Sequence, residues 1–85
     1  MLFHIGNNFS VSDKDLISIM DLENITIMKD SREFLKMCEE EEFTQVVAPG
    51  EMPKSVILTE ENGQTRVYLS PISVATLRKR VAEII

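Results

Sequence analysis

The sequence predicts a small α+β fold: a largely antiparallel sheet of five to six short strands with two helices, in the order β-β-(β)-α-β-β-β-α. Two stretches in which apolar and polar residues alternate, each broken by turn-forming residues, predict the sheet. Two further segments with apolar residues at helical spacing predict helices that do not alternate one by one with the strands. No linker, repeat or low-complexity tract divides the chain, so residues 1–85 are expected to form a single domain.

The N-terminal residues 2–11 predict a β-hairpin. Apolar and polar side chains alternate before and after Gly6-Asn7-Asn8, and these three residue types tolerate positive φ angles. Such a turn between two alternating runs is typical of two antiparallel strands. The hairpin is therefore expected to present one apolar face to the core.

Residues 12–23 fit two structures. Leu16 and Ile19 lie on one face of a helix, which favours a helical segment. The alternation of Ile17, Ser18 and Ile19 is instead typical of a strand. We favour a strand that follows a short turn.

The middle of the chain predicts a helix, a strand and a loop in turn. Residues 30–42, DSREFLKMCEEEE, begin with Asp30 or Ser31, either of which can accept N–H bonds at a helix start. Residues 43–48 are typical of a strand. The two prolines and the glycine of residues 49–53 exclude regular structure there.

The last third of the chain predicts a second hairpin and a closing helix. Residues 54–59 and 65–70 are rich in β-branched and aromatic side chains, and Asn62-Gly63 lies between them, as in a tight hairpin turn. Either Ser70-Pro71 or Ser73 can then begin the final helix, since proline suits a first-turn position and serine suits a cap.

The final helix carries an apolar stripe and three consecutive cations. At about 100° per residue, the apolar side chains of this helix fall within a stripe roughly 80° wide; they are Val74, Leu77, Val81 and Ile84. Arg78 is expected at the edge of the stripe, and Lys79 and Arg80 on either side of the polar back. The three cations therefore do not form one patch on a single helix.

The chain has a formal net charge of -5, and this charge is uneven. Residues 1–49 hold ten acidic against four basic residues, a balance of -6, whereas residues 50–85 hold four acidic against five basic residues, a balance of +1. An acidic surface repels phosphate, so any contact with nucleic acid needs a separate basic patch. That patch is expected in the C-terminal part of the chain.

The length and the cysteine content limit the core size and the cellular location that are expected of the protein. A chain of 85 residues buries a thin core, so oligomerisation is expected to stabilise it. Cys38 is the one cysteine, which excludes an intramolecular disulfide and fits a reducing, cytoplasmic location. No export leader and no apolar run of the roughly 20 residues that span a bilayer is seen, so no membrane association is expected.

No catalytic or cofactor chemistry is indicated. His4 and Cys38 stand alone, without a nucleophile motif, a glycine-rich phosphate loop or metal-ligand spacing. The acidic run Glu39–Glu42 could bind cations, but such a run is usually a solvated face. Phe3 and Tyr68 could stack on bases, although strand aromatics in so small a chain usually lie in the core. We expect no enzyme, no cofactor and no metal site.

Three segments resemble the small bacterial RemA/RemB family of extracellular-matrix regulators, and its RemB branch more closely. They are HIGNNFSVSDKDLISIMD at residues 4–21, PKSVILT at residues 53–59 and YLSPISVATLRKR at residues 68–80. The resemblance implies a cytoplasmic regulator of genes for the biofilm matrix. It also implies a closed homo-oligomeric ring, because members of the RemA branch form rings that bind DNA through arginines.

Carried over residue by residue, the resemblance is mixed. The adjacent arginines of RemA-type members, in the loop before the central hairpin, correspond here to Glu51 and Met52. An early basic position corresponds to Asp15, with Lys14 beside it. Arg80 matches a basic residue near the end of both branches. The candidate DNA-binding residues of this chain are Lys54, Arg66, Arg78, Lys79 and Arg80.

Two functions remain open. In the first, the protein is a ring-forming regulator that binds the DNA backbone through a basic rim, which symmetry builds from two or three cations per subunit. In the second, it is an oligomeric protein-interaction module that modulates other regulatory proteins without binding DNA. Steeply salt-dependent DNA binding, through cations gathered on one surface of the assembly, would distinguish the first from the second.

Overall fold

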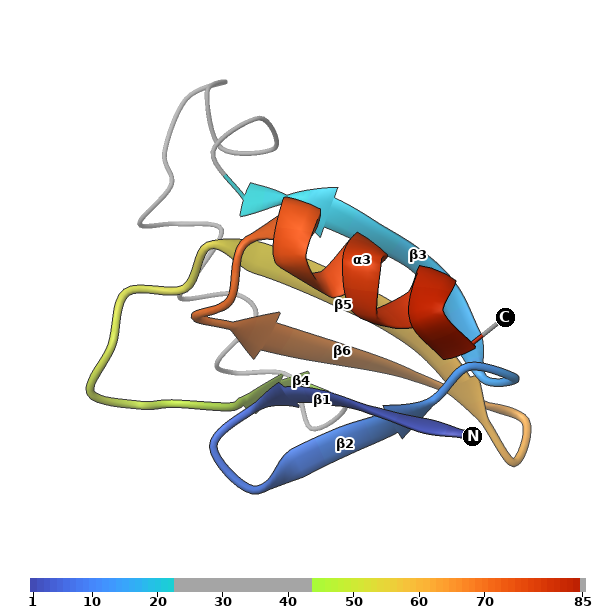
Figure 1. Ribbon diagram of the computed structural model, residues 1–85. Helices are drawn as coiled ribbons and strands as arrows, with labels where there is room; N and C mark the ends of the chain where they lie inside the picture. The colour runs from blue at the N-terminus through green and yellow to red at the C-terminus, as the bar shows by residue number, and fades with distance from the viewer. Residues whose placement is uncertain (23–43, 85) are drawn as a thin grey trace.

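The computed structural model describes residues 1–22 and 44–84, which form six strands and one helix (Figure 1). The elements are β1 (Leu2–Gly6), β2 (Phe9–Ser12), β3 (Leu16–Asp21), β4 (Thr44–Val46), β5 (Ser55–Glu61), β6 (Gln64–Ser70) and α3 (Val74–Ile84). The predicted α+β class and strand order are confirmed. One helix rather than two is seen in this part of the chain, and the helix predicted at residues 30–42 lies outside the described residues.

The six strands form two sheets rather than one. β1 and β2 make a separate antiparallel hairpin, and the other strands form a four-stranded sheet in the order β3-β5-β6-β4. The hairpin buries Phe3, Ile5 and Val11 by packing face-on, in one cluster with residues of the larger sheet, instead of pairing with its edge. This packing covers apolar side chains that edge pairing would leave in water.

One strand pair is parallel, in a sheet that is otherwise antiparallel. β4 runs parallel to β6, with Val46 opposite Leu69, while β5 pairs antiparallel with both β3 and β6. The loop after β4 carries the chain past β6 to reach β5 (Figure 1). The strand expected at residues 43–48 is thus present in shorter form, and its direction is set by this crossing.

The ambiguous segment before residue 22 is a strand, as favoured. β3 pairs with β5 along its whole length, with Ile19 opposite Ile57 and a β-bulge between Leu16 and Ser18. The bulge turns Ile17 outward, so that this side chain is 53% exposed. Pairing with a neighbouring strand has decided a segment whose local sequence fits a helix equally well.

Both predicted turns adopt the backbone expected of them. Asn62 and Gly63 have φ angles of 52° and 80°, which are the two positive values of a type I′ hairpin turn. Gly6 has a φ of 120°, and a Cβ there would lie 3.2 Å from both Pro71 and Val47. Glycine is therefore needed at residue 6 for its conformation and for the close approach of its neighbours.

The main core lies between the four-stranded sheet, the β1–β2 hairpin and α3 (Figure 1). Leu77 of α3 is completely buried there, and Val81 and Ile84 pack against the same cluster, which confirms the apolar stripe of the final helix. A second, smaller cluster on the sheet contains Leu22, Val56 and Leu69. In residues 1–22 and 44–84, no helix is both long and apolar enough to cross a bilayer.

Candidate nucleic-acid interface

Hydrogen bonds of two buried serines fix the turn that leads into α3. The Ser70 hydroxyl donates to the Ile5 carbonyl at 2.6 Å and accepts from the Ile72 N–H at 3.0 Å. The Ser55 hydroxyl donates to the Ile72 carbonyl at 2.8 Å. Because buried hydroxyls need partners, these three bonds tie the turn before α3 both to β1 and to β5.

Ser73 is the residue that caps α3, which settles one of the two alternatives left open by the sequence. Its side-chain oxygen accepts the N–H of Thr76 at 3.3 Å, and its carbonyl accepts the N–H of Leu77 at 3.0 Å. The first bond gives the Thr76 N–H a partner that the helix itself cannot supply. The second is the first backbone hydrogen bond of the helix. The cap fixes the rotation of α3, and so the directions of its three cations.

Two of those cations face water, and the third is held by the hairpin. Arg78 and Lys79 are exposed, whereas Arg80 is half-buried. The Arg80 guanidinium donates through Nη1 to the His4 carbonyl on β1, at 2.8 Å. The same nitrogen lies 3.5 Å from His4 Nδ1. A charge-assisted bond therefore fastens α3 to β1.

The sequence placed Arg80 on the polar back of the helix, and this expectation was wrong, because Arg80 is half-buried against β1. On a helical wheel, Arg80 lies about 40° from Ile84, and Arg78 lies about 40° from Val74, so both flank the apolar stripe. Arg80 is the one that finds a partner, because its side of the stripe faces β1. Local spacing could not distinguish the two sides, since it holds no information about which neighbour lies there.

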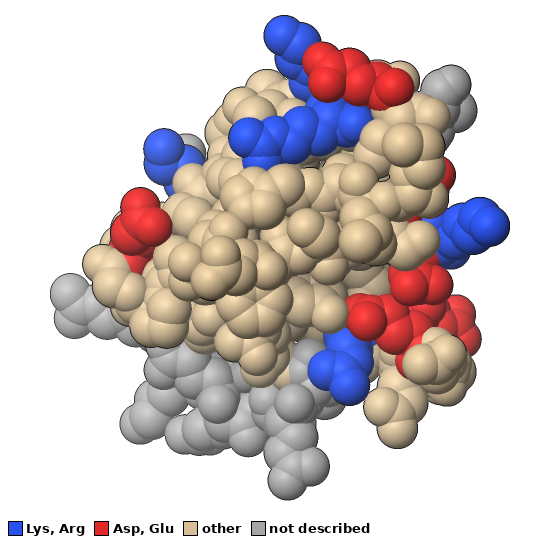
Figure 2. Space-filling model, turned by 60° about the horizontal axis from the view of Figure 1, so that its bottom comes forward, with Lys and Arg blue, Asp and Glu red and all other residues tan. Residues whose placement is uncertain are grey.

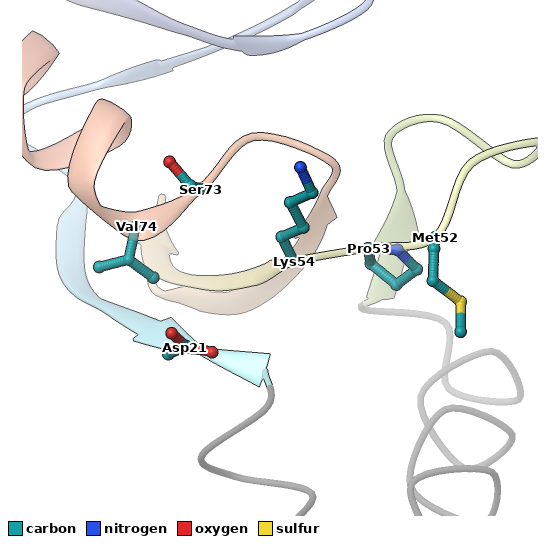
Figure 3. A pocket seen from close by; sticks show the side chains of 6 residues that line it. All are labelled: Asp21, Met52, Pro53, Lys54, Ser73 and Val74. Atoms are coloured by element: carbon teal, nitrogen blue, oxygen red, sulfur yellow. The ribbon is translucent and has the colours of Figure 1, made fainter.

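Lys54 lies beside the start of α3. Its N–H donates to the Ser70 carbonyl at 2.7 Å and its carbonyl accepts the Leu22 N–H at 3.1 Å, so its main chain is held between β6 and the end of β3. The side chain is exposed and rises toward Ser73 and the turn before α3 (Figure 3). Along the helix axis, Lys79 lies about 9 Å beyond Ser73.

Lys54 also lines a pocket of about 340 Å³ (Figure 3). Its other walls come from Asp21, Met52, Pro53, Ser73 and Val74. The pocket thus has one acidic and one basic residue, and the Asp21 carboxylate opposes the entry of a phosphate beside Lys54. In the part of the chain that the structure describes, no group of three or more His, Cys, Asp or Glu residues is placed to hold a metal ion.

Arg66 lies at the other end of the β5–β6 hairpin. It is exposed and pairs with Thr59, whereas Lys54 precedes Ser55, which pairs with Ser70. Four residues of strand separate Arg66 from Ser70, or about 13 Å. On α3 the structure thus exposes Arg78 and Lys79, which point about 100° apart, with Lys54 near the start of the helix, and it sets Arg66 apart from Lys54.

A single copy has no continuous basic patch on the face that Figure 2 shows. There, Lys and Arg side chains lie apart around the border, acidic side chains lie between some of them, and the centre carries no charge. On α3 itself, Glu83 follows Lys79 by four residues, which places the two on the same side of the helix. On this face, an extended basic surface would need several copies that repeat these few cations.

Phe3 and Tyr68 are core residues, as the sequence favoured, and not stacking platforms for bases. Phe3 is buried, and Tyr68 is buried with its ring 6.4 Å from that of Phe9. The Tyr68 hydroxyl donates to Glu61 at 2.7 Å, and the Thr59 hydroxyl donates to the same carboxylate oxygen at 2.7 Å. Burial, with help from the bond to Glu61, raises the pKa of Tyr68 to about 12.

The sequence matches one protein family over nearly its full length. The model of the RemA-like family, described as extracellular matrix regulatory protein A-like, matches residues 2–81. The chain belongs to the RemA-like family. Extracellular matrix regulatory protein B of Bacillus subtilis (strain 168) is 35% identical to it over 81 residues, which cover 94% of this chain and 89% of that protein.

The matched range of this RemA-like chain includes the whole candidate interface. It runs from β1 into α3 and contains Lys54, Arg66, Arg78, Lys79 and Arg80. The likeness to a protein named as regulator B fits the resemblance to the RemB branch. The family carries a regulatory description rather than an enzymatic one.

Proposed function

We propose that this RemA-like protein regulates the expression of genes for the extracellular, biofilm-type matrix, and that it does so as a ring-forming homo-oligomer that contacts the DNA backbone through α3. Family membership and the likeness to a matrix regulatory protein support the regulatory part. The observation that carries the DNA contact is the exposure of Arg78 and Lys79, neighbours on a helix whose apolar side is fixed to the core.

Arg78 and Lys79 are available for phosphate. The ion pair seen within the described residues joins the N-terminal ammonium to Asp13 and involves neither of them. Cations with no carboxylate to release can neutralise phosphates at little cost, and each such contact displaces a condensed counterion. Arg80 can add to this surface, because a guanidinium has five N–H donors and the His4 carbonyl uses one of its nitrogens.

Symmetry is required, because one copy is acidic. With a net charge of -5 and two fully exposed cations on α3, a monomer would bind DNA weakly if at all. A closed ring would place the Arg78–Lys79 pair at regular intervals around one rim. The summed field of that rim could then follow a curved duplex.

The test is a titration of duplex DNA with the protein at two salt concentrations. Charge reversal at Arg78→Glu and Lys79→Glu is expected to abolish binding, and the wild type is expected to lose affinity steeply as salt rises, by a slope of about 0.9 per phosphate contact. A matched control reverses one exposed cation elsewhere, Lys14→Glu, and is compared with the single change Arg78→Glu; it is expected to retain most of the binding.

Two different results would contradict this proposal, one the role of α3 and the other the binding of DNA. If the control loses binding as completely as the α3 variant, the contact surface is not α3. If the wild type binds no duplex at moderate salt, the DNA role fails, and an oligomeric protein-interaction module that modulates other regulators becomes the better account. That alternative draws support from Met52, which is 80% exposed on the loop before β5, beside Glu51.

A further inference from the structure

We propose that the outer edge of β2 pairs with β2 of a second copy of this chain, antiparallel about a two-fold axis, to form a four-stranded sheet from two hairpins. This pairing concerns assembly only, and it does not depend on DNA contact by α3. The argument rests on the hydrogen-bond pattern of the hairpin, on the protection of the other strand edges, and on the absence of charge along residues 2–12.

The hydrogen bonds of the hairpin show which backbone groups face outward. The Asp13 N–H donates to the Met1 carbonyl at 3.0 Å, which makes these two residues a hydrogen-bonded pair. Since such pairs alternate with non-bonded ones, Phe3 and Val11 form the next bonded pair, and the pair of His4 with Ser10 is non-bonded. The N–H and C=O of a non-bonded pair point away from the partner strand.

The two outer edges of the hairpin then differ. On β1, the outward carbonyl of His4 is occupied by Arg80 of α3. On β2, the outward groups are those of Ser10 and the N–H of Ser12, because the Ser12 carbonyl already accepts the Asp15 N–H. Ser10 is exposed, and β2 has β1 as its single strand neighbour among the described residues.

Other strand edges in the described part of the chain carry features that oppose pairing. β3 has a bulge between Leu16 and Ser18, and β4 is three residues long. Bulges, short length, charges and proline are the means by which proteins block edge-to-edge association. β2 (FSVS) is also short, with four residues, but it has no charge and no proline, and no other described strand pairs with its outer edge.

The absence of charge points to a second copy as the occupant. Residues 2–12 contain no Asp, Glu, Lys or Arg, in a chain in which 27% of residues are charged. In a two-fold interface each side chain near the axis meets its own copy, so any charge there would face a like charge. Figure 2 shows this side of the molecule, with an uncharged centre and the charged side chains around it.

The outward face of the hairpin also carries exposed apolar surface. Leu2 is 68% exposed, while its neighbour Phe3 points into the core. Depletion of charge at the centre with polar and charged groups at the border is the usual anatomy of a protein interface. Backbone bonds along β2 would provide orientation, while Leu2, on β1, lies one strand away from the contact.

The experiment measures the molar mass of the full chain by light scattering after size exclusion. Ser10→Lys places a charge opposite its own copy, and Ser10→Pro removes an outward N–H that β1 does not use. Both variants are expected to have a lower molar mass than the wild type, half of it if the wild type is a dimer and that of a smaller assembly if it is a ring, with unchanged far-ultraviolet circular dichroism. Gln64→Lys, which adds the same charge at the other hairpin, is expected to keep the full mass.

A second readout needs no substitution. Hydrogen exchange at the Ser10 and Ser12 amides is expected to be slow in concentrated protein and to accelerate at least tenfold on dilution below the dissociation concentration. Unchanged masses for both Ser10 variants, or fast exchange of these amides at every concentration, would overturn the pairing while leaving the DNA contact by α3 untested by that result. A wild type of two subunits would support the pairing and contradict a ring.

Discussion

At the scale of single residues, Arg80 joins structure to the candidate interface. Its guanidinium donates to the His4 carbonyl, and the His4 ring lies between Arg80 and the Asn7 carbonyl. The Asn7 carbonyl, 2.6 Å from His4 Nε2, can only accept, so Nε2 carries the proton. Arg80 Nη1 also lies 3.5 Å from His4 Nδ1, so the α3–β1 contact involves both the main chain and the ring of His4.

Replacing Arg80→Ala is expected to lower the free energy of unfolding by about 1 kcal/mol, because the charge-assisted bond to the His4 carbonyl is lost. The matched change Arg78→Ala, at an exposed residue the same distance from the apolar stripe, is expected to cost less than about 0.5 kcal/mol. Urea denaturation of both variants measures the difference. Equal losses would mean that the His4 contact adds nothing to stability.

Tyr68 gives the protein an alkaline stability limit. In the folded chain burial and Glu61 raise its pKa to about 12, against 10.0 for a free tyrosine. The folded state therefore keeps a proton that the unfolded state loses between these values, so stability is complete below pH 10 and falls as the pH rises toward 12. Tyr68→Phe is expected to remove this part of the pH dependence.

The measurement is unusually direct, because Tyr68 is the one tyrosine of the chain and there is no tryptophan. Tyrosinate absorbance during an alkaline titration of the folded protein reports this residue alone. A midpoint near 10 in protein that is still folded by circular dichroism would contradict the buried bond to Glu61. Denaturant-unfolded protein supplies the reference curve.

At the scale of elements, contacts at its N-terminal end and along one side hold α3 in place. The serine cap begins it, the buried Leu77 fixes its face, and Arg80 fastens its side to β1. The helix is eleven residues long, which is marginal for an isolated helix in water. Its orientation therefore depends on these tertiary contacts more than on helix propensity.

Removal of the cap by Ser73→Ala is expected to lower the free energy of unfolding by about 1 kcal/mol, since the Thr76 N–H loses its acceptor. Ser73→Asp keeps an acceptor and adds a negative charge at the helix N-terminus, so it is expected to retain wild-type stability or exceed it. Guanidinium denaturation compares the three proteins. If alanine and aspartate behave alike, Ser73 does not cap the helix in solution.

At the scale of the whole molecule, assembly is the property from which most of the proposed function follows. Within residues 1–22 and 44–84 the main cluster contains seven buried residues, so the core of this part of the chain is small. Self-association would bury further apolar surface and would repeat the cations of α3. Self-association would then account for both added stability and the proposed DNA contact.

The midpoint of thermal unfolding is accordingly expected to rise with protein concentration, because subunit association stabilises the folded state by mass action. Scanning calorimetry over a hundredfold range of concentration measures the shift. Ser10→Lys, which should dissociate the β2 pairing, is expected to flatten the dependence. A midpoint that stays constant over the range would show that the folded monomer is stable without a partner.

The sequence determined those features that depend on neighbours along the chain. The alternation around Gly6-Asn7-Asn8, the Asn62-Gly63 turn and the apolar stripe through Leu77 each describe one element, and the structure confirms them. Local spacing sufficed there because side-chain periodicity and turn conformation are local properties. The exposure of Lys79, on the polar back of the helix, was predictable for the same reason.

Only the tertiary structure decided the features that depend on contacts between distant segments. Pairing with β5 made β3 a strand, the crossing past β6 made β4 parallel, and the position of β1 beside α3 separated Arg80 from Arg78. None of these partners is recorded in local spacing, because each lies dozens of residues away along the chain. Packing brings such segments together, and it thereby selects among arrangements that the local sequence permits equally.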